Sequence, residues 1–257
     1  MEATGIAVVT GASRGIGRAV AVCLAEAGFD VVATMRDPAA GEGLPPSIRV
    51  TALDVTRPET IVLPEGLRVL VNNAGIERDY LPVEVAPMGQ WRDVFETNVF
   101  GLVEVTQRAI PLMRAAGGGV ICNVTSSSLL VGVPFYGVYR ASKAAVEAMG
   151  ESLRAEVAPF GIRVVEIMPG PVESDMLAGS DRLPEAAKFP GYEEMAEAMR
   201  QGRAAVGDMT TPAPVAAAAI RDAILSDDGP LRWGCDPLGT QLIAAWRADP
   251  EGTMGAG

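Results

Sequence analysis

The stretch Thr10-Gly-Ala-Ser-Arg-Gly-Ile-Gly17 joins a run of apolar and β-branched residues, Gly5–Thr10, to a helical pattern that ends at Gly28. Because its glycines lack side chains, the backbone can turn tightly there and approach a pyrophosphate, which the N–H groups of a helix N-terminus attract. The spacing GxxxGxG departs from the GxGxxG pattern of many dinucleotide-binding proteins, and no Lys-Ser or Lys-Thr pair follows as in a P-loop. The stretch predicts a strand, a glycine turn and a helix, with a nucleotide site and a plain tight turn as the two interpretations.

A second apolar run, Val31–Thr34, completes a strand–helix–strand unit whose crossover is expected to be right-handed. Helical patterns separate several further buried strands, which are predicted at Val50–Leu53, Val69–Val71, Val120–Val124 and Val164–Ile167. This alternation predicts an α/β fold, a single-domain doubly wound (Rossmann-type) parallel sheet flanked by helices, over residues 1–257. The segments after the second and third predicted strands are rich in proline and glycine, so neither is expected to hold a long helix and that edge of the sheet is expected to be poorly covered.

Composition excludes several classes of site. The formal net charge is −11, so the chain is expected to repel phosphate backbones and anionic membranes, and neither nucleic acid nor a membrane is a predicted partner. The chain has no histidine and its 3 cysteines are far apart, so no zinc or other metal site, Ser-His-Asp triad or disulfide framework is expected. The N-terminus shows no secretory signal, and glycines and polar residues interrupt the uncharged stretch after Arg114, so a cytoplasmic protein is expected.

Residues 174–211 differ in character from the rest, with charges, glycines and prolines, no strand pattern and one helical patch around Tyr192–Arg203. A long insertion without strands is typical of a functional loop, so this segment is expected to form a substrate-binding loop or lid. Beyond it, the alanine run Ala216–Ala219 predicts a helix that begins after Pro214.

Residues that follow the second, third and fourth predicted strands have the character of a nucleotide cleft. Where an acidic residue would bind a ribose 2′-hydroxyl, the chain has Met35 and Arg36, with Arg14 in the glycine turn, which favours a 2′-phosphate. Asp54-Val55 lies where an adenine edge is held, and Asn72-Asn-Ala-Gly75 ends the next strand. Solvated arginines and ordinary turns are the alternative interpretations, so NADP is the favoured cofactor and NAD remains the alternative.

Without histidine, proton transfer near neutral pH needs another group, and Tyr139 with Lys143 is the candidate. Tyrosine has an ordinary pKa of about 10, so it serves as an acid–base group only where positive charge stabilises its phenolate. Residues four apart share one face of a helix, so Lys143 is expected to lower the pKa of Tyr139, aided by the charge of an oxidised nicotinamide. Ser126, after the fifth predicted strand, is placed to hydrogen-bond a substrate oxygen. A solvated helix face is the alternative for an isolated Tyr/Lys pair.

Together these motifs resemble the short-chain dehydrogenase/reductase family, in the branch with TGxxxGxG and YxxxK. The likeness runs from about Gly5 to Val172 and includes, in order, "TGASRGIG", "LDVT", "NNAG", "TNVFG", "NVTSSS", "YRASK" and "PGPV". It implies that Tyr139 is the acid–base residue, that Lys143 lowers its pKa and binds the nicotinamide ribose, and that Ser126 polarises the carbonyl. It also implies that Asn98 holds a water that connects Lys143 to solvent as a proton relay.

The resemblance and the positions at strand ends together assign the cofactor site. The residues expected to bind the nicotinamide nucleotide are Gly11, Ser13, Arg14, Ile16, Gly17, Arg36, Asp54, Val55, Asn73, Ala74, Gly75, Tyr139, Lys143, Pro169, Gly170 and Val172.

Two features bear on assembly. The C-terminal stretch "LRWGCDPLGTQLIAAWR" loosely resembles the endings of family members related to hydroxysteroid and retinol dehydrogenases, which are often dimers and prefer NADP. In the helix after Tyr139, small residues form a stripe that permits close helix approach, at Ala141, Ala145, Ala148, Ser152 and Ala155. The stripe is expected to face either the sheet or a partner subunit, and a homo-oligomer, a dimer or a tetramer, is predicted.

The sequence thus predicts an NADP-dependent oxidoreductase that transfers hydride between nicotinamide and a carbonyl or alcohol, with a ketone and a secondary alcohol favoured. A fairly apolar small-molecule substrate is favoured by the residues of the loop before Tyr139, which include Leu129, Leu130, Val133, Pro134 and Phe135. Two alternatives stay open: a catalytically silent NADP-binding sensor or scaffold, and an enzyme in which Lys143 is a Schiff-base nucleophile.

Overall fold

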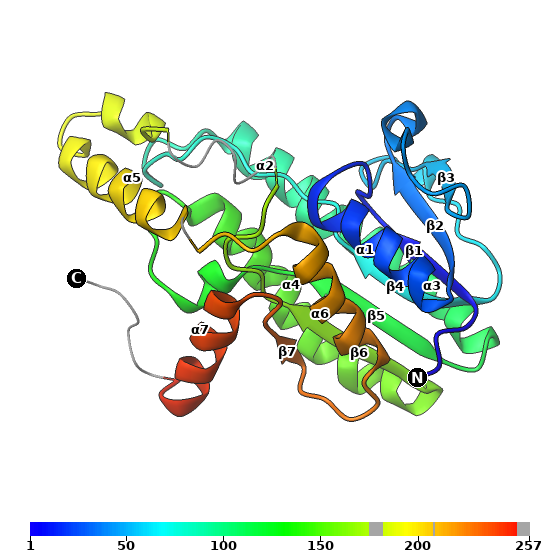
Figure 1. Ribbon diagram of the computed structural model, residues 1–257. Coiled ribbons are helices and arrows are strands. Elements are labelled where there is room, and N and C mark those ends of the chain that lie inside the picture. Colours follow the sequence, from blue (N-terminus) through cyan, green and yellow to red (C-terminus); the bar gives the residue numbers. More distant parts are fainter. Residues whose placement is uncertain (175–181, 208, 251–257) are drawn as a thin grey trace.

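The computed structural model describes residues 1–174, 182–207 and 209–250, and in these residues seven parallel strands form one sheet. The strands are β1 (Ile6–Val9), β2 (Asp30–Met35), β3 (Arg49–Ala52), β4 (Leu67–Asn72), β5 (Gly119–Val124), β6 (Ile162–Ile167) and β7 (Arg232–Trp233). Their order across the sheet is β3-β2-β1-β4-β5-β6-β7 (Figure 1). The predicted fold class is confirmed, and the six predicted strands lie within two residues of their predicted bounds. The short edge strand β7 was not predicted, because Arg-Trp carries no apolar run.

Helices cover both faces of the sheet, because alternate strand residues point to opposite sides. On one face, residues such as Ala7 and Val9 pack against α1 (Gly15–Ala27) and α6 (Ala213–Leu225), which lie side by side (Figure 1). On the other face, residues such as Val8 and Ile121 pack against α3 (Leu102–Ala115) and α4 (Gly137–Val157). The two cores are built almost entirely from aliphatic side chains, in a chain of which only 5% of the residues are aromatic.

The two proline-rich connections are short, as predicted. The segment after β2 holds one 3-10 turn, η1 (Pro38–Gly41), and the segment after β3 holds another, η2 (Pro58–Thr60). No residue of β3 is buried, so the prediction that this edge of the sheet is poorly covered is also confirmed. α1 ends at Gly28, whose φ of 116° lets its N–H bond back to the carbonyl oxygens of Leu24 and Ala25.

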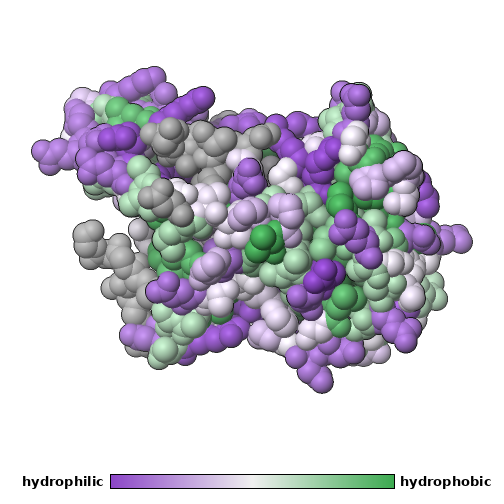
Figure 2. All heavy atoms as spheres, in the orientation of Figure 1, coloured by the Kyte–Doolittle hydropathy of each residue, from purple (hydrophilic) through white to green (hydrophobic). Residues whose placement is uncertain are grey.

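The region between β6 and α6 projects beyond the sheet (Figure 1). Its described part contains the 3-10 turn η6 (Glu185–Lys188) and α5 (Glu193–Gly207), which confirms the predicted helical patch and extends it. Residues 175–181 and 208 of the predicted lid lie outside the described residues. Figure 2 shows hydrophilic side chains over the outer surface of α5, whereas Ala196 and Met199 are buried.

The remaining elements complete the outer layers. α2 (Met88–Phe95) leads through one π-helical turn, η3 (Glu96–Gly101), into α3, and η4 (Ser127–Leu130) follows β5. A 3-10 turn, η5 (Ala158–Phe160), ends α4, and α7 (Pro237–Ala248) follows β7. Within the described ranges, no helix combines the length and the apolar character needed to cross a lipid bilayer.

The small-residue stripe of α4 faces away from the sheet. The buried face of α4 consists of other residues, among them Val146, Gly150 and Leu153. Of the stripe, Ala148 and Ser152 are exposed and Ala145 is half-buried. The alternative in which the stripe packs on the sheet is therefore wrong, because Val146, Gly150 and Leu153 on the opposite face of α4 pack there instead.

A row of polar side chains crosses the sheet beneath α4. Asn72, Asn123, Glu166 and Arg232 are neighbours in register on β4, β5, β6 and β7. Asn72 donates a hydrogen bond of 3.0 Å to Asn123, and the Glu166 carboxylate lies 4.0 Å from the Arg232 guanidinium. Glu166 is 0% exposed, and in the described part of the chain neither of its carboxylate oxygens has a hydrogen-bond partner. The carboxylate fits there because Gly150 of α4 has no side chain: a Cβ on Gly150 would lie 2.1 Å from Oε1.

This buried acid makes stability depend on pH. Burial raises the pKa of Glu166 from 4.5 to about 8, with Glu147 and Glu151 adding to the rise and Arg232 opposing it. Between pH 4.5 and about 8 the folded chain therefore binds more protons than the unfolded chain. The contribution of Glu166 to stability is complete below pH 4.5 and is lost as the pH rises through about 8. We expect the free energy of unfolding of the wild type to fall more steeply between about pH 6 and about pH 9 than that of Glu166→Gln. Urea denaturation across this range tests it, and equal slopes would contradict a raised pKa.

Candidate active site

A cavity of about 1450 Å³ opens at the carboxyl ends of the central strands. It is lined by the turn after β1, by the ends of β2, β4 and β5, and by one face of α5. Successive strands run outward from β1 to β3 and then from β4 to β7, so the cavity lies where the strand order reverses. Parallel α/β sheets bind ligands in this crevice.

The turn after β1 is shaped to approach a ligand. Gly11 has φ 64° and Gly15 has φ 53°, values that disfavour residues with side chains. A Cβ on Gly11 would lie 2.8 Å from the Cα of Ala74, and a Cβ on Gly17 would lie 2.3 Å from the amide nitrogen of Asn73. Arg14, the N-cap residue of α1, makes no side-chain cap, so the helix N-terminus presents its N–H groups at the cavity. The arrangement fits the pyrophosphate of a dinucleotide.

The end of β4 is tied to this turn. The Thr10 hydroxyl accepts hydrogen bonds from the backbone N–H groups of Asn73 (3.0 Å) and Ala74 (3.1 Å). In return, the Asn73 amide donates to the carbonyl oxygens of Thr10 (3.0 Å) and Gly11 (3.1 Å). These bonds hold Asn73, Ala74 and Gly75 at the cavity wall, where the sequence predicted them.

The ends of β2 and β3 supply the opposite end of the cavity. Met35 is buried, and Arg36 after it is exposed and lines the cavity, as does Arg14. Asp54 accepts hydrogen bonds from the N–H (3.0 Å) and hydroxyl (2.8 Å) of Thr56, so it forms a turn, and it also lines the cavity. Positions 35 and 36 carry no acidic side chain, and the next residue, Asp37, accepts a hydrogen bond from the Ala39 N–H of η1 and does not line the cavity, so the two arginines fit a 2′-phosphate.

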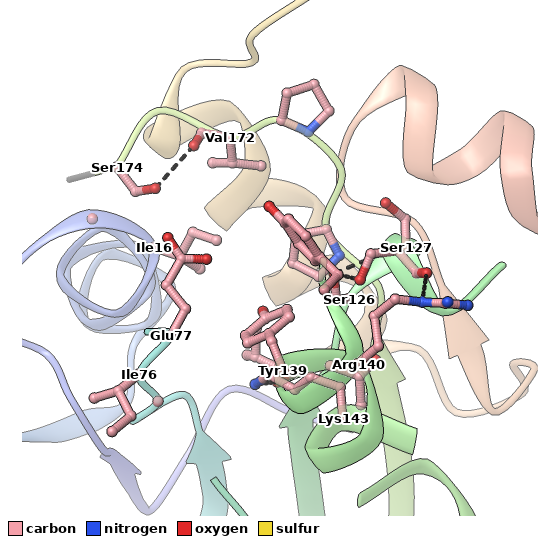
Figure 3. A pocket seen from close by; sticks show the side chains of 18 of the residues that line it. Ile16, Ile76, Glu77, Ser126, Ser127, Tyr139, Arg140, Lys143, Val172 and Ser174 are labelled. Atoms are coloured by element: carbon pink, nitrogen blue, oxygen red, sulfur yellow. Dashed lines mark hydrogen bonds between the residues drawn. The ribbon is translucent and has the colours of Figure 1, made fainter. Parts of the chain in front are cut away.

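Ser126, Tyr139 and Lys143 come together on one wall, at the end of β5 and the start of α4, with Ile16 and Glu77 across from them (Figure 3). Lys143 is 5% exposed, and its ammonium donates a hydrogen bond of 2.8 Å to the carbonyl oxygen of Val124. The same nitrogen lies 5.7 Å from the centre of the Tyr139 ring. The Ser126 and Ser128 hydroxyls share a hydrogen bond of 2.9 Å.

Several neighbouring groups act on the pKa of Tyr139. Burial raises it above the ordinary value of 10, the charge of Glu77 raises it further, and a hydrogen bond with Ser126 opposes the rise. In this structure the Lys143 ammonium donates its hydrogen bond to a backbone carbonyl. Its lowering of the Tyr139 pKa, which also involves an oxidised nicotinamide, stays a prediction. Burial lowers the pKa of Lys143 to about 8. Tyr139 is therefore a protonated phenol at neutral pH in this structure.

Asn98 lies behind this wall, in the π-helical turn η3. It is 1% exposed and holds the backbone of Ile76 with two hydrogen bonds, accepting from its N–H (2.8 Å) and donating to its carbonyl (2.9 Å). It also donates to the Ser142 hydroxyl over 3.0 Å. A Cβ on Gly75 would lie 3.3 Å from the Asn98 oxygen and 3.5 Å from the Lys143 nitrogen, so Asn98 and Lys143 both adjoin Gly75. π-helical turns are often found at functional sites.

The structure brings the predicted cofactor residues to one cavity, including Pro169, Gly170 and Val172 after β6. Of the predicted site residues, Gly17 and Asn98 are not on the lining: Gly17 packs against Asn73, and Asn98 supports the loop after Gly75.

Sequence reasoning missed four side chains at this site. Asp236, 5% exposed, accepts a hydrogen bond of 2.6 Å from the Gly170 N–H and so anchors the loop after β6. Arg140 donates to the carbonyl of Ser128 over 2.7 Å and steadies the serine loop. Glu77 and Arg203 line the cavity from the loop after β4 and from α5. Only Glu77, two residues after "NNAG", had a positional signal.

This chain is similar in sequence and in fold to known proteins. Residues 5–183 match the sequence pattern of the family described as short chain dehydrogenase. The uncharacterized oxidoreductase YusZ of Bacillus subtilis (strain 168) is 42% identical over 191 residues, 68% of this chain and 68% of that protein. Retinol dehydrogenase 8 of Bos taurus is 33% identical over a 273-residue alignment that covers 96% of this chain and 86% of that protein. A short chain dehydrogenase from Burkholderia cenocepacia J2315, solved in complex with NADP, is 26% identical with a TM-score of 0.78, over 98% of this chain and 96% of that chain.

This chain belongs to the short-chain dehydrogenase/reductase family. It is an oxidoreductase of that family that uses a nicotinamide cofactor and acts on CH–OH or carbonyl groups.

Proposed function

We propose that this protein is an NADP-dependent oxidoreductase that transfers hydride between nicotinamide and the carbonyl or alcohol of a fairly apolar small molecule. The observation that carries the proposal is one continuous cavity. It joins the glycine turn and Arg36 at one end to Ser126, Tyr139 and Lys143 at the other.

The chain's own residues supply the proton chemistry. Ser126 donates a hydrogen bond to the substrate oxygen, and Tyr139 gives its proton to that oxygen in reduction or takes it in oxidation. When bound, the nicotinamide donates or accepts the hydride. Lys143 holds positive charge near the phenol, which stabilises the phenolate once the proton has left. Burial raises the pKa of Tyr139 further above neutral pH, so the phenol carries the proton that carbonyl reduction requires.

The residues that fit the cofactor are those that line the cavity from β1 to β4. Gly11, Ser13 and Ile16 face the pyrophosphate side, and Arg14 and Arg36 provide charge for a 2′-phosphate. Asp54 and Val55 line the adenine end. Lys143 is placed to bind the nicotinamide ribose, and Asn98 keeps Ile76 and Gly75 in place beside it.

The substrate end of the cavity supports an apolar substrate. Three elements line it with apolar side chains, which are Met195, Met199 and Val206 of α5, Leu238 and Leu242 of α7, and Val131, Val133 and Pro134 of the loop before α4. Leu129, Leu130 and Phe135 of that loop do not line the cavity. Apolar walls of this kind bind ligands through buried surface, with a few polar groups to orient them.

Three further proposals concern organisation. We propose that residues 1–257 form one domain in which 174–211 act as the substrate-binding lid, supported by α5 on the cavity wall. We propose a homo-oligomer, supported by the outward small-residue stripe of α4. We propose a cytoplasmic location, supported by the buried free thiols of Cys23, Cys122 and Cys235, since exported proteins commonly form disulfides.

Cofactor choice is tested by one substitution. We expect Arg36→Ala to raise the Kd for NADPH by about tenfold to a hundredfold and to leave the Kd for NADH within about twofold, because it removes a charge-assisted hydrogen bond to the 2′-phosphate. Fluorescence titration of both nucleotides measures this, with Arg49→Ala as control because Arg49 is exposed on β3 away from the cavity. Equal losses for both nucleotides, or none for either, would contradict the proposed 2′-phosphate contact.

A further inference from the structure

One polar cluster interrupts the apolar substrate end of the cavity. Tyr80 and Tyr136 stack with ring centroids 4.9 Å apart and planes 2° from parallel. The Arg203 guanidinium of α5 lies over both rings, 4.2 Å from the centre of Tyr80 and 5.0 Å from that of Tyr136. Arg203 donates hydrogen bonds to the hydroxyl oxygens of Tyr80 (2.9 Å) and Tyr136. The guanidinium thus joins the lid helix to the loop before α4.

Of the two tyrosines only Tyr136 lines the cavity, and it does so beside the reacting centre. Its ring lies edge-on to Tyr139, with centroids 5.9 Å apart and planes at 87°. Tyr136 is the N-cap residue of α4 and Tyr139 lies in the first turn of that helix, so their spacing is set by rigid backbone. A group bound by Tyr136 therefore has a defined position relative to a carbonyl held at Tyr139 and Ser126.

The hydrogen-bond chemistry of Tyr136 is that of a donor. A hydroxyl has one proton and two acceptor sites, and a guanidinium has donors only, so the bond from Arg203 uses the Tyr136 oxygen. The hydrogen bond with Tyr80 lowers the Tyr136 pKa, as a bond donated to that oxygen does, so the Tyr136 proton is left to be donated. Burial raises the pKa of Tyr136, so the proton is present at neutral pH. A hydroxyl that accepts from a cation is polarised and donates more strongly.

Charge at the cluster favours an uncharged ligand atom. Glu77 also lines the cavity, where burial raises its pKa while a hydrogen bond with Tyr80 and the charge of Arg203 oppose the rise. A substrate carboxylate would lose hydration in this partly desolvated site, and the Arg203 charge that it could pair with is already engaged by Glu77 and by both tyrosine hydroxyls. A carbonyl, hydroxyl or ether oxygen accepts the Tyr136 proton without that cost.

We propose that Tyr136, held and polarised by Arg203, is a specificity-determining residue that recognises a second, uncharged oxygen on the substrate. The reacting carbonyl then lies at Ser126 and Tyr139, and the second oxygen lies on the side of the cavity that faces α5. This inference rests on the proposed reductase function and narrows its substrate class to apolar ketones or aldehydes with two oxygen functions.

The test compares two phenylalanine variants. Tyr136→Phe and Tyr80→Phe each remove one hydroxyl from the same stacked pair and one bond to Arg203. Tyr80→Phe also removes the hydrogen bonds to Glu77 and Tyr136, but only Tyr136→Phe removes a hydroxyl of a residue that lines the cavity. The substrates are methyl hexyl ketone, its diketone analogues with the second carbonyl one, two or three carbons away, and a keto acid of the same chain length. The quantity measured is kcat/KM with NADPH, expressed as the ratio of each substrate to methyl hexyl ketone within one variant, so that the intrinsic reactivity of each compound cancels between variants.

We expect the wild type to prefer at least one diketone by a ratio that Tyr136→Phe lowers about tenfold and Tyr80→Phe changes by less than about twofold. An unchanged ratio in Tyr136→Phe, or an equal fall in both variants, would overturn the inference while leaving the reductase function intact. A preference of the wild type for the keto acid would overturn the assignment to an uncharged oxygen. If the wild type bound NADPH but reduced none of the compounds, the proposed function would fail, and this inference with it.

Discussion

Tyr139→Phe is expected to lower kcat/KM for carbonyl reduction by about a hundredfold to ten-thousandfold while leaving NADPH binding within about threefold. The substitution removes only the phenol oxygen, so the aromatic ring keeps its contact with Tyr136 and its place near Lys143. What is lost is the proton that the substrate oxygen receives as hydride arrives. Steady-state kinetics with the best ketone, together with NADPH titration, measures the two effects separately.

The matched control is Tyr192→Phe. The Tyr192 hydroxyl donates to Glu84 over 2.7 Å at the surface and does not line the cavity, so its loss is expected to leave turnover within about twofold. If Tyr139→Phe retained more than about a tenth of wild-type turnover, proton transfer would have to come from another group. Glu77 would then be the first candidate, since it faces Tyr139 across the cavity (Figure 3).

The second large effect concerns stability. Gly150→Ala is expected to lower the free energy of unfolding by about 1–3 kcal/mol, because its Cβ would lie 2.1 Å from Oε1 of Glu166 and 3.5 Å from the amide nitrogen of Asn123. In an exposed helix the same substitution stabilises by about 1 kcal/mol. A fall in the free energy of unfolding on Gly150→Ala, where an exposed helix would show a rise, therefore indicates that α4 closely contacts the polar row of the sheet. Urea denaturation at neutral pH measures it.

Two further variants isolate that contact. Gly89→Ala in α2 adds a methyl group with nothing within 4 Å of it, so it is expected to be neutral or stabilising. Glu166→Ala removes the carboxylate that meets the new Cβ, so adding Gly150→Ala to it is expected to cost much less than in the wild type. If Gly150→Ala behaved like Gly89→Ala, the tight approach of α4 to Glu166 would be refuted.

Local sequence patterns predicted the fold where the signal is local. The apolar runs of β1, β2 and β5 are each bounded by glycine, proline or polar residues, and the glycine turn lies between an apolar run and a helical pattern. β7 was missed because its two residues become a strand only by pairing with Glu166 and Ile167 of β6. Likewise, the sequence does not show whether the small-residue stripe of α4 faces the sheet or points outward. In the structure Val146 and Leu153 are buried, so the stripe points outward.

At the candidate site too, some features were predictable from the sequence and others were not. Ser126, Tyr139 and Lys143 were predicted because their spacing is a motif, and the structure places all three on one cavity. The raised pKa of Tyr139 was not predicted, since it depends on burial and on Glu77, 62 positions earlier in the chain. The contact of Arg203 with Tyr80 and Tyr136 joins α5 to two loops. Hydrophobic periodicity in the sequence cannot predict a contact between segments so far apart in the chain.

The measurement that tests the central claim most directly is transfer of label from NADPH deuterated on the nicotinamide ring to the product of a ketone or aldehyde panel, followed by mass spectrometry. We predict that deuterium appears on the carbinol carbon of at least one apolar substrate, faster with the NADPH label than with the corresponding NADH label, and that Tyr139→Phe abolishes the transfer. Binding of NADPH with no label transferred to any member of the panel would contradict the account and would indicate a nucleotide-binding protein without reductase chemistry.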